Sequence, residues 1–227
     1  MATQLDLQEQ EQLDQLKTLW KQYGNLLTWL LIAALSAYAA WNGWNWWQRQ
    51  QSTKAAAMYD ELEKAARAGD VDKTGRVFTD LKERFPRTVF SEQAALLAAK
   101  LQFDSGKLDQ ARATLAWVSE NAIEAEYQTI ARLRLAGVLL DEKKYDEALK
   151  QLDAATAKEF EALVADRRGD VLLAQGKNTQ AQAAYRTAWK AMDATVPYRQ
   201  LIEAKLTAMG AAPKAEKSEA PAKEATP

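Results

Sequence analysis

The sequence contains neither histidine nor cysteine. Without histidine, it lacks the most common general base and metal ligand of enzymes. Without cysteine, it can form no disulfide, thiolate nucleophile or zinc–thiolate site. We also find no glycine-rich phosphate loop and no nucleophile elbow. These absences predict a protein that is not an enzyme, needs no metal or cofactor and acts on no small-molecule substrate.

Glycine and proline are scarce, with 9 and 5 residues in a chain of 227, while alanine is abundant. Alanine is the best helix former and glycine and proline are the worst, so this composition predicts an all-α fold. The 30 basic residues are balanced by 31 acidic ones. Since no basic excess is available to neutralise phosphates, we expect no nucleic-acid partner.

Residues 22–48 carry no charged side chain. A helix rises about 1.5 Å per residue, so about 20 apolar residues cross the hydrocarbon core of a bilayer. We therefore predict a single transmembrane helix at residues 23–48, in contact with the lipid bilayer. Aromatic residues gather toward both ends, as expected for rings at the level of the headgroups. The predicted membrane-interface residues are Trp20, Tyr23, Trp41, Trp44, Trp46 and Trp47.

Two other interpretations of this segment are a buried helix of a soluble core and a cleaved signal peptide. The signal peptide would use the small residues Ala37 and Ala39, but the preceding tail is long and contains several acidic residues. The tail, residues 1–22, has apolar residues spaced by three to four from Leu13 onward, which predicts an amphipathic helix on a membrane or partner surface. Lysine and arginine flank the apolar segment almost equally, so charge does not decide its orientation. A short tail before a first membrane helix more often stays in the cytoplasm, which would place the large domain outside.

The rest of the chain contains internal repeats. Three segments align without gaps: LLAAKLQFDSGKLDQARATL from Leu96, LRLAGVLLDEKKYDEALKQL from Leu133, and DRRGDVLLAQGKNTQAQAAY from Asp166. Each reads as an apolar helix, a polar turn and a second helix, and a period near 34 residues is typical of tetratricopeptide arrays. The sequence therefore predicts a tetratricopeptide-like solenoid of helical hairpins over residues 52–210.

Residue types recur at fixed places in these units. At the small residues we expect helices to approach closely; these are Ala99, Ala136, Gly169, Ala111, Ala148 and Ala181. In the turns we expect a left-handed backbone at Gly106, Lys143 and Gly176. We expect packing toward the following unit at Leu115, Leu152 and Tyr185. A weaker unit precedes them, with Gly69 ending its first helix and Thr74 at the small position of its second. We expect a closing helix at Tyr198–Met209 and, because large apolar residues are missing, disorder at residues 211–227.

First helices line the concave wall of such a superhelix, and its mixture of apolar and charged residues suits an extended peptide or a partner helix. We expect about half of the candidates to pack between helices instead. The candidate partner-binding residues are Gln93, Leu96, Lys100, Phe103, Ile130, Leu133, Leu140, Leu163, Asp166 and Asp170. Asp166 and Asp170 share a helix face, and Arg134 is their expected partner across the helices.

The stretch Arg168–Gly176, which reads RGDVLLAQG, together with Ala184-Tyr185, Pro197 and Lys205-Leu206, resembles the YfgM family. The resemblance runs from Leu5 to about Met209. It implies an ancillary subunit of the bacterial SecYEG translocon, anchored in the inner membrane with its domain in the periplasm. It also implies partners among periplasmic chaperones. An alternative hypothesis is a chaperone-like holdase that binds unfolded translocated segments directly. A third, an envelope enzyme or cell-wall assembly factor, would need catalytic residues that we do not find.

Overall fold

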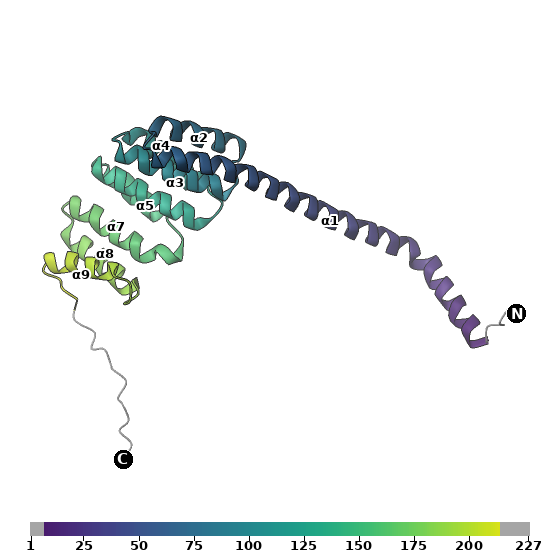
Figure 1. Ribbon diagram of the computed structural model, residues 1–227. Coiled ribbons are helices and arrows are strands. Elements are labelled where there is room, and N and C mark those ends of the chain that lie inside the picture. Colours follow the sequence, from purple (N-terminus) through teal and green to yellow (C-terminus); the bar gives the residue numbers. More distant parts are fainter. Residues whose placement is uncertain (1–6, 214–227) are drawn as a thin grey trace, which may run out of the picture. The chain divides into compact units, whose positions relative to one another are not determined.

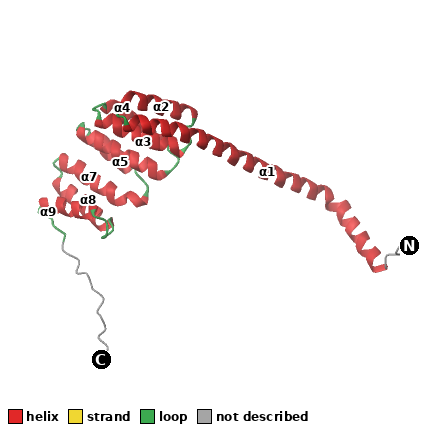
Figure 2. Ribbon diagram, in the orientation of Figure 1, coloured by secondary structure: helices red, strands yellow, loops and turns green. Residues whose placement is uncertain are grey.

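The computed structural model describes residues 7–213, and within this range every regular element is helical, with no strand (Figure 2). The predicted all-α fold is confirmed. The helices are α1 (Leu7–Arg67), α2 (Val71–Arg84), α3 (Val89–Asp104), α4 (Leu108–Asn121), α5 (Ala125–Asp141), α6 (Tyr145–Asp153), α7 (Glu161–Ala174), α8 (Asn178–Ala191) and α9 (Tyr198–Ala208), with a short 3-10 helix at Lys158–Phe160.

The chain divides into two compact units, residues 1–54 and 55–227, and α1 contributes to both. The apolar stretch of α1 is exposed, since only 6% of its most apolar window is buried. A core helix would be mostly covered, so the buried-core interpretation does not fit. By length and composition, α1 is one helix able to cross a membrane. The exact limits of the span, residues 23–48, stay a prediction.

In the second unit, the end of α1 pairs with α2, and the pairs α3–α4, α5–α6 and α7–α8 follow as stacked hairpins (Figure 1). The last helix, α9, follows these pairs. The turns have the predicted left-handed backbone, with φ of +74° at both Gly106 and Gly176. Gly69 ends the first hairpin's opening helix in the same way, with φ of +73°. Lys143 adopts φ of 61° at the equivalent place, a conformation that costs a residue with a Cβ about 1 kcal/mol or more. The shared turn geometry confirms that the units are repeats.

The predicted small positions lie where helices approach closely. Ala111, Ala148 and Ala181 are all 0% exposed, and Thr74 at the same place in the first hairpin is also 0% exposed. On the first helices, Ala99 and Ala136 are buried and Gly169 lies directly under the ring of Tyr185. Tyr185 also shares a buried core with Ile202 and Leu206 of α9, so it packs toward the element that follows, as expected. Gly169 lets the ring lie against its own hairpin as well, because it leaves room for an aromatic ring between α7 and α8.

The last hairpin is covered by α9, as predicted. Ile202 and Leu206 of α9 are fully buried in a core shared with α7 and α8. Ala211 joins the same core at 8% exposed, and its N–H donates to the carbonyl of Leu206 at 2.9 Å. Ordered chain thus extends past the expected limit at residue 210. The remainder of the predicted disordered tail, from residue 214 onward, lies outside the described residues, as does Leu5.

Candidate protein-binding groove

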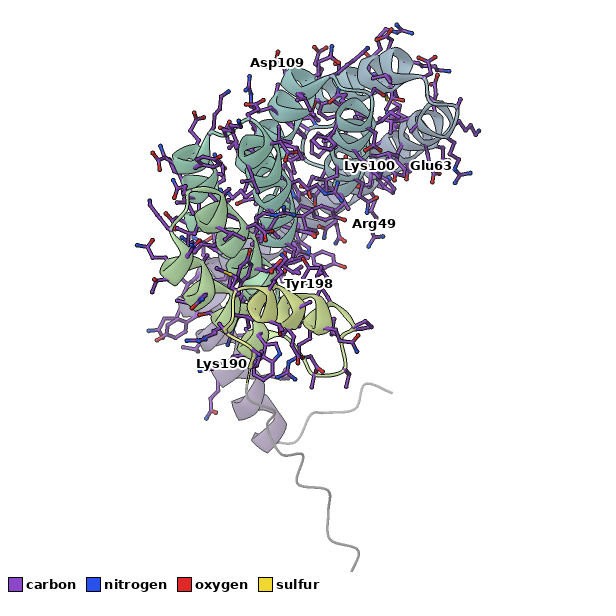
Figure 3. The ribbon with its side chains drawn as sticks, turned by 90° about the vertical axis from the view of Figure 1, so that its left-hand side faces the viewer. Arg49, Glu63, Lys100, Asp109, Lys190 and Tyr198 are labelled. Carbon is purple, nitrogen blue, oxygen red and sulfur yellow. The ribbon has the colours of Figure 1, made fainter. Side chains whose placement is uncertain are left out.

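A groove of about 370 Å³ opens between three first helices of the hairpins, α3, α5 and α7, with one residue of α4 in its floor. It combines an apolar floor with charged side chains. Its lining residues are Ala99, Lys100, Phe103, Leu115, Arg134, Gly137, Val138, Asp141 and Arg167. Figure 3 shows the side chains of the protein as sticks and labels Lys100 of α3, one of the residues that line the groove.

The floor of the groove is apolar. Leu115 and Val138 are 2% and 4% exposed, so they are part of the core that the groove reaches. Phe103, at 39% exposed, is the most exposed aromatic side chain of the described repeat domain. An aromatic ring left half open to water above a buried apolar floor offers a partner side chain a place to be buried.

Three cations border this floor. Lys100 forms an ion pair with Asp104, one turn along α3. Arg134 of α5 donates from its guanidinium to the carbonyl oxygen of Leu96 at 3.1 Å. Arg167 of α7 reaches over α5, where its guanidinium lies 3.8 Å from the point a Cβ on Gly137 would occupy. Arg134 and Gly137 are three residues apart on one face of α5, so the two guanidinium groups approach the same stretch of helix.

Of the ten predicted partner-binding residues, Lys100 and Phe103 line the groove. The side-chain amide of Gln93 donates to the Tyr127 hydroxyl at 2.9 Å, which links α3 to α5. The remaining apolar candidates are buried or partly buried, most of them packed in or against the core; these are Leu96, Ile130, Leu133, Leu140 and Leu163. These five of the ten are thus buried or partly buried, and partner binding by any of the ten stays a prediction.

Asp166 and Asp170 belong to a polar network that fastens α9 onto α7 and α8. The Lys205 ammonium donates at 2.8 Å to both oxygens of Asp166 and to Oδ1 of Asp170. The hydroxyls of Tyr198 and Tyr185 donate at 2.8 Å to Asp166 and Asp170, respectively. The expected pairing of these acids with Arg134 is wrong, because α9 brings Lys205 closer and Arg134 turns toward α3.

This network is buried enough to change the acidity of its two tyrosines. Asp166 is 2% exposed, yet both of its carboxylate oxygens are bonded. Burial and the bond to Asp170 raise the pKa of Tyr185 far above its ordinary value. Burial and the bond to Asp166 raise the pKa of Tyr198 in the same way. Both hydroxyls therefore remain protonated donors, which suits a structural fastening.

Sequence reasoning did not assign Arg134, Gly137, Asp141 or Arg167 to the groove. One signal was present: Gly137 stands in the interior of a helix, where glycine costs about 1 kcal/mol relative to alanine. Such a residue usually marks a close approach, and here it is approached by Arg167. The position of Arg167 depends on how α7 stacks on α5, which local periodicity does not reveal.

The predicted membrane-interface residues all lie on α1 and are exposed, from 46% at Tyr23 to 68% at Trp41. The rings of Trp44 and Trp47 are 5.3 Å apart. Trp20 and Trp41 are separated by 41 − 20 = 21 positions, which is about 32 Å along a helix and close to the thickness of the hydrocarbon core, about 30 Å. The aromatic residues are thus spaced as two interfacial belts.

Within residues 7–213, no cluster of three acidic side chains is placed to hold a metal ion. The expectation of a protein without cofactor or catalytic site stays a prediction. What the described residues do present is a helix able to cross a membrane and a stack of helical hairpins with an open groove. These features define a tetratricopeptide-like repeat protein with a candidate membrane anchor.

The chain belongs to the tetratricopeptide repeat-like domain family, which it matches over residues 17–211. It is 33% identical over 204 residues to the ancillary SecYEG translocon subunit of Neisseria gonorrhoeae, covering 89% of this chain and 98% of that protein. It is 26% identical over 198 residues to the ancillary SecYEG translocon subunit of Escherichia coli, covering 87% and 95% of the two chains. A protein of the same name in Haemophilus influenzae is 24% identical over 182 residues, or 80% and 89% of the chains. The resemblance inferred from the repeats is confirmed.

Proposed function

We propose that this protein is a non-enzymatic adaptor, an ancillary subunit of a SecYEG translocon, that binds other proteins through its helical repeats. The observation that carries the proposal is the 33% identity that extends over 98% of a relative named for that role. A match of this extent includes the apolar part of α1 as well as the repeats, which supports a shared role for the two parts together.

The groove between α3, α5 and α7 gives the adaptor its binding surface. It joins an exposed aromatic ring to charged groups, a combination that binds peptide segments by burial and orients them by polar contacts. The partner that the proposal assigns to it is a periplasmic chaperone, which the translocon-bound protein would hold close to emerging chains.

The proposal includes an inner-membrane location, with which the exposed apolar helix and the translocon relatives agree. It places the repeat domain in the periplasm. Because the natural chain has no cysteine, one introduced thiol gives a unique label. We expect a membrane-impermeant maleimide to label the Lys190→Cys variant in spheroplasts and the Lys17→Cys variant only after the membrane is opened. Both side chains are exposed, so the reverse pattern would refute the orientation.

The partner assignment is tested by purification of the full chain in mild detergent, followed by mass spectrometry. We expect recovery of translocon subunits, and their absence would contradict the proposal. A photocrosslinker at Phe103 then separates adaptor from holdase. One discrete chaperone adduct supports the adaptor, whereas a broad mixture of unfolded clients supports the holdase.

A further inference from the structure

The charges of the groove specify more than a generic protein partner. This inference rests on the proposed function, because it concerns the same groove. Lys100 already has a carboxylate partner in Asp104. Among residues 7–213, Arg134 forms no ion pair, and its guanidinium bonds to a backbone carbonyl. Its charge is therefore not neutralised by the chain around it.

Arg167 is only loosely neutralised. Its nearest carboxylate oxygen belongs to Asp170, at 3.7 Å, and the other oxygen of Asp170 is bonded to Lys205 and Tyr185. By contrast, Arg168, the next residue, forms a close pair with Asp153 at 2.7 Å. The two adjacent arginines of α7 thus differ, because Arg168, outside the groove, has a close carboxylate partner and Arg167, which lines the groove, has none among the described residues.

The setting of Arg134 strengthens its attraction for an anion. Protein atoms surround the side chain closely enough that desolvation lowers the pKa of Arg134, while the side chain stays open toward the groove. A guanidinium in such surroundings is weakly hydrated and forms strong, often bidentate, bonds with carboxylates. Asp141 also lines the groove, so the two arginines face one acid there and positive charge remains in excess.

We propose that the groove of α3, α5 and α7 binds an extended segment of a partner protein in which an Asp or Glu lies two positions from a large apolar residue. The carboxylate is held between Arg134 and Arg167, and the apolar side chain is buried against Phe103 above Leu115 and Val138. Alternate side chains of an extended chain point to the same side, so an acid and an apolar residue two positions apart enter together.

The acid comes from side chains within the segment, and not from a chain end. The two cations of the groove that lack a close carboxylate partner within the described part of the chain lie on successive first helices, Arg134 on α5 and Arg167 on α7. Positive charge spread in this way matches a segment that passes along the groove with more than one acid. A chain end offers a single carboxylate.

The test measures binding of fluorescein-labelled peptides to the full chain in mild detergent, by fluorescence anisotropy. The probe is a short peptide, blocked at both ends, in which acids (Asp or Glu) and apolar residues (Leu or Phe) take turns at every second position, with Ser at the positions between, so that both kinds point to the same side of the extended chain. Its controls carry Asn and Gln in place of the acids, or Ser in place of the apolar residues. A further probe is the Asn/Gln peptide with a free C-terminal carboxylate. We expect the acidic–apolar probe to bind at least about tenfold more tightly than each of the other peptides. The two Asn/Gln peptides lose the charge-assisted hydrogen bonds of the acids, and the Ser peptide loses the apolar burial.

Variants locate the site. The Arg134→Gln/Arg167→Gln double variant should bind the probe at least about tenfold more weakly, with an unchanged melting temperature. The matched control is Arg168→Gln, which removes the same charge from the same helix outside the groove and should bind as the parent does. Binding to the parent should weaken with added salt, and this measurement holds even if the double variant does not fold.

Equal binding of the acidic and the Asn/Gln peptides would overturn this inference, as would equal binding by the parent and a folded double variant. Preference for the free C-terminal carboxylate would also overturn it. Each of these results leaves the proposed function intact if translocon subunits still copurify with the chain. Loss of that copurification from the parent protein is the separate result that contradicts the proposed function.

Discussion

Replacing Gly169 by alanine should destabilise the repeat domain, although alanine is the better helix former. The added Cβ would lie 2.4 Å from Cε1 of Tyr185 and 2.5 Å from Cδ1. Carbon atoms in contact are normally about 3.5–4.0 Å apart, so the ring must move by about 1 Å. Tyr185 is 1% exposed and its hydroxyl is bonded to Asp170, so no free space is available for that movement.

The magnitude follows from three terms. Overpacking of a filled core costs about 1–3 kcal/mol. Weakening the bond from Tyr185 to the Asp170 carboxylate costs about 1 kcal/mol more. Alanine in place of glycine returns about 1 kcal/mol through helix propensity. The net loss is about 2 kcal/mol, which lowers the melting temperature of a chain of this size by about 4–8 °C.

Gly75 provides the matched control. It also lies in the interior of a helix, but the nearest atom to its added Cβ is Nε2 of Gln102 at 4.0 Å, an ordinary contact. Gly75→Ala should therefore raise the melting temperature, by about 2–4 °C for a gain of about 1 kcal/mol. Circular dichroism of the full chain in mild detergent measures both variants. Coupling is checked in a Tyr185→Leu background, where the cost of Gly169→Ala should largely disappear. A Gly169→Ala variant as stable as the parent would refute the packing argument.

Three further changes test the turn, a buried acid and the fastening of the last helix. Lys143→Gly relieves the left-handed strain at φ of 61° and should stabilise by about 1 kcal/mol, measured as a higher urea midpoint; no gain would refute the strain. Glu92 is 1% exposed, and burial raises its pKa. The protonated carboxyl group therefore favours folding below the unfolded pKa, about 4.3, and that contribution is lost as pH rises through the folded pKa. Glu92→Gln keeps an acceptor for the N–H of Ile123 and should melt above the parent at pH 7, with the gap closing toward pH 4; a gap that widens toward low pH contradicts this. Lys205→Met leaves the buried Asp166 with only a tyrosine donor and should cost about 2 kcal/mol in urea unfolding, much of it recovered when Asp166→Asn is added.

Much of the fold could be predicted from the sequence because the signals are local. The absence of charge between Lys21 and Arg49 is visible in the chain itself, and so is its length relative to a bilayer. Turn glycines such as Gly106 are required by backbone sterics, which depend on one residue and its neighbours. Small residues recurring in one register, such as Ala111 and Ala148, report helix approaches that every repeat makes in the same way.

The binding surface was decided only by the tertiary structure. Periodicity assigns a residue to a helix face, but each first helix here is covered to a different depth by its neighbours. Leu96 is consequently buried while Phe103, seven positions later on the same face, remains open. The partner of Asp166 was likewise undetermined, because Lys205 is 39 residues away in the chain and is brought near only by the packing of α9. Sequence determined which helices form and where they turn; stacking determined which charges are neutralised and which, such as Arg134, remain for a partner.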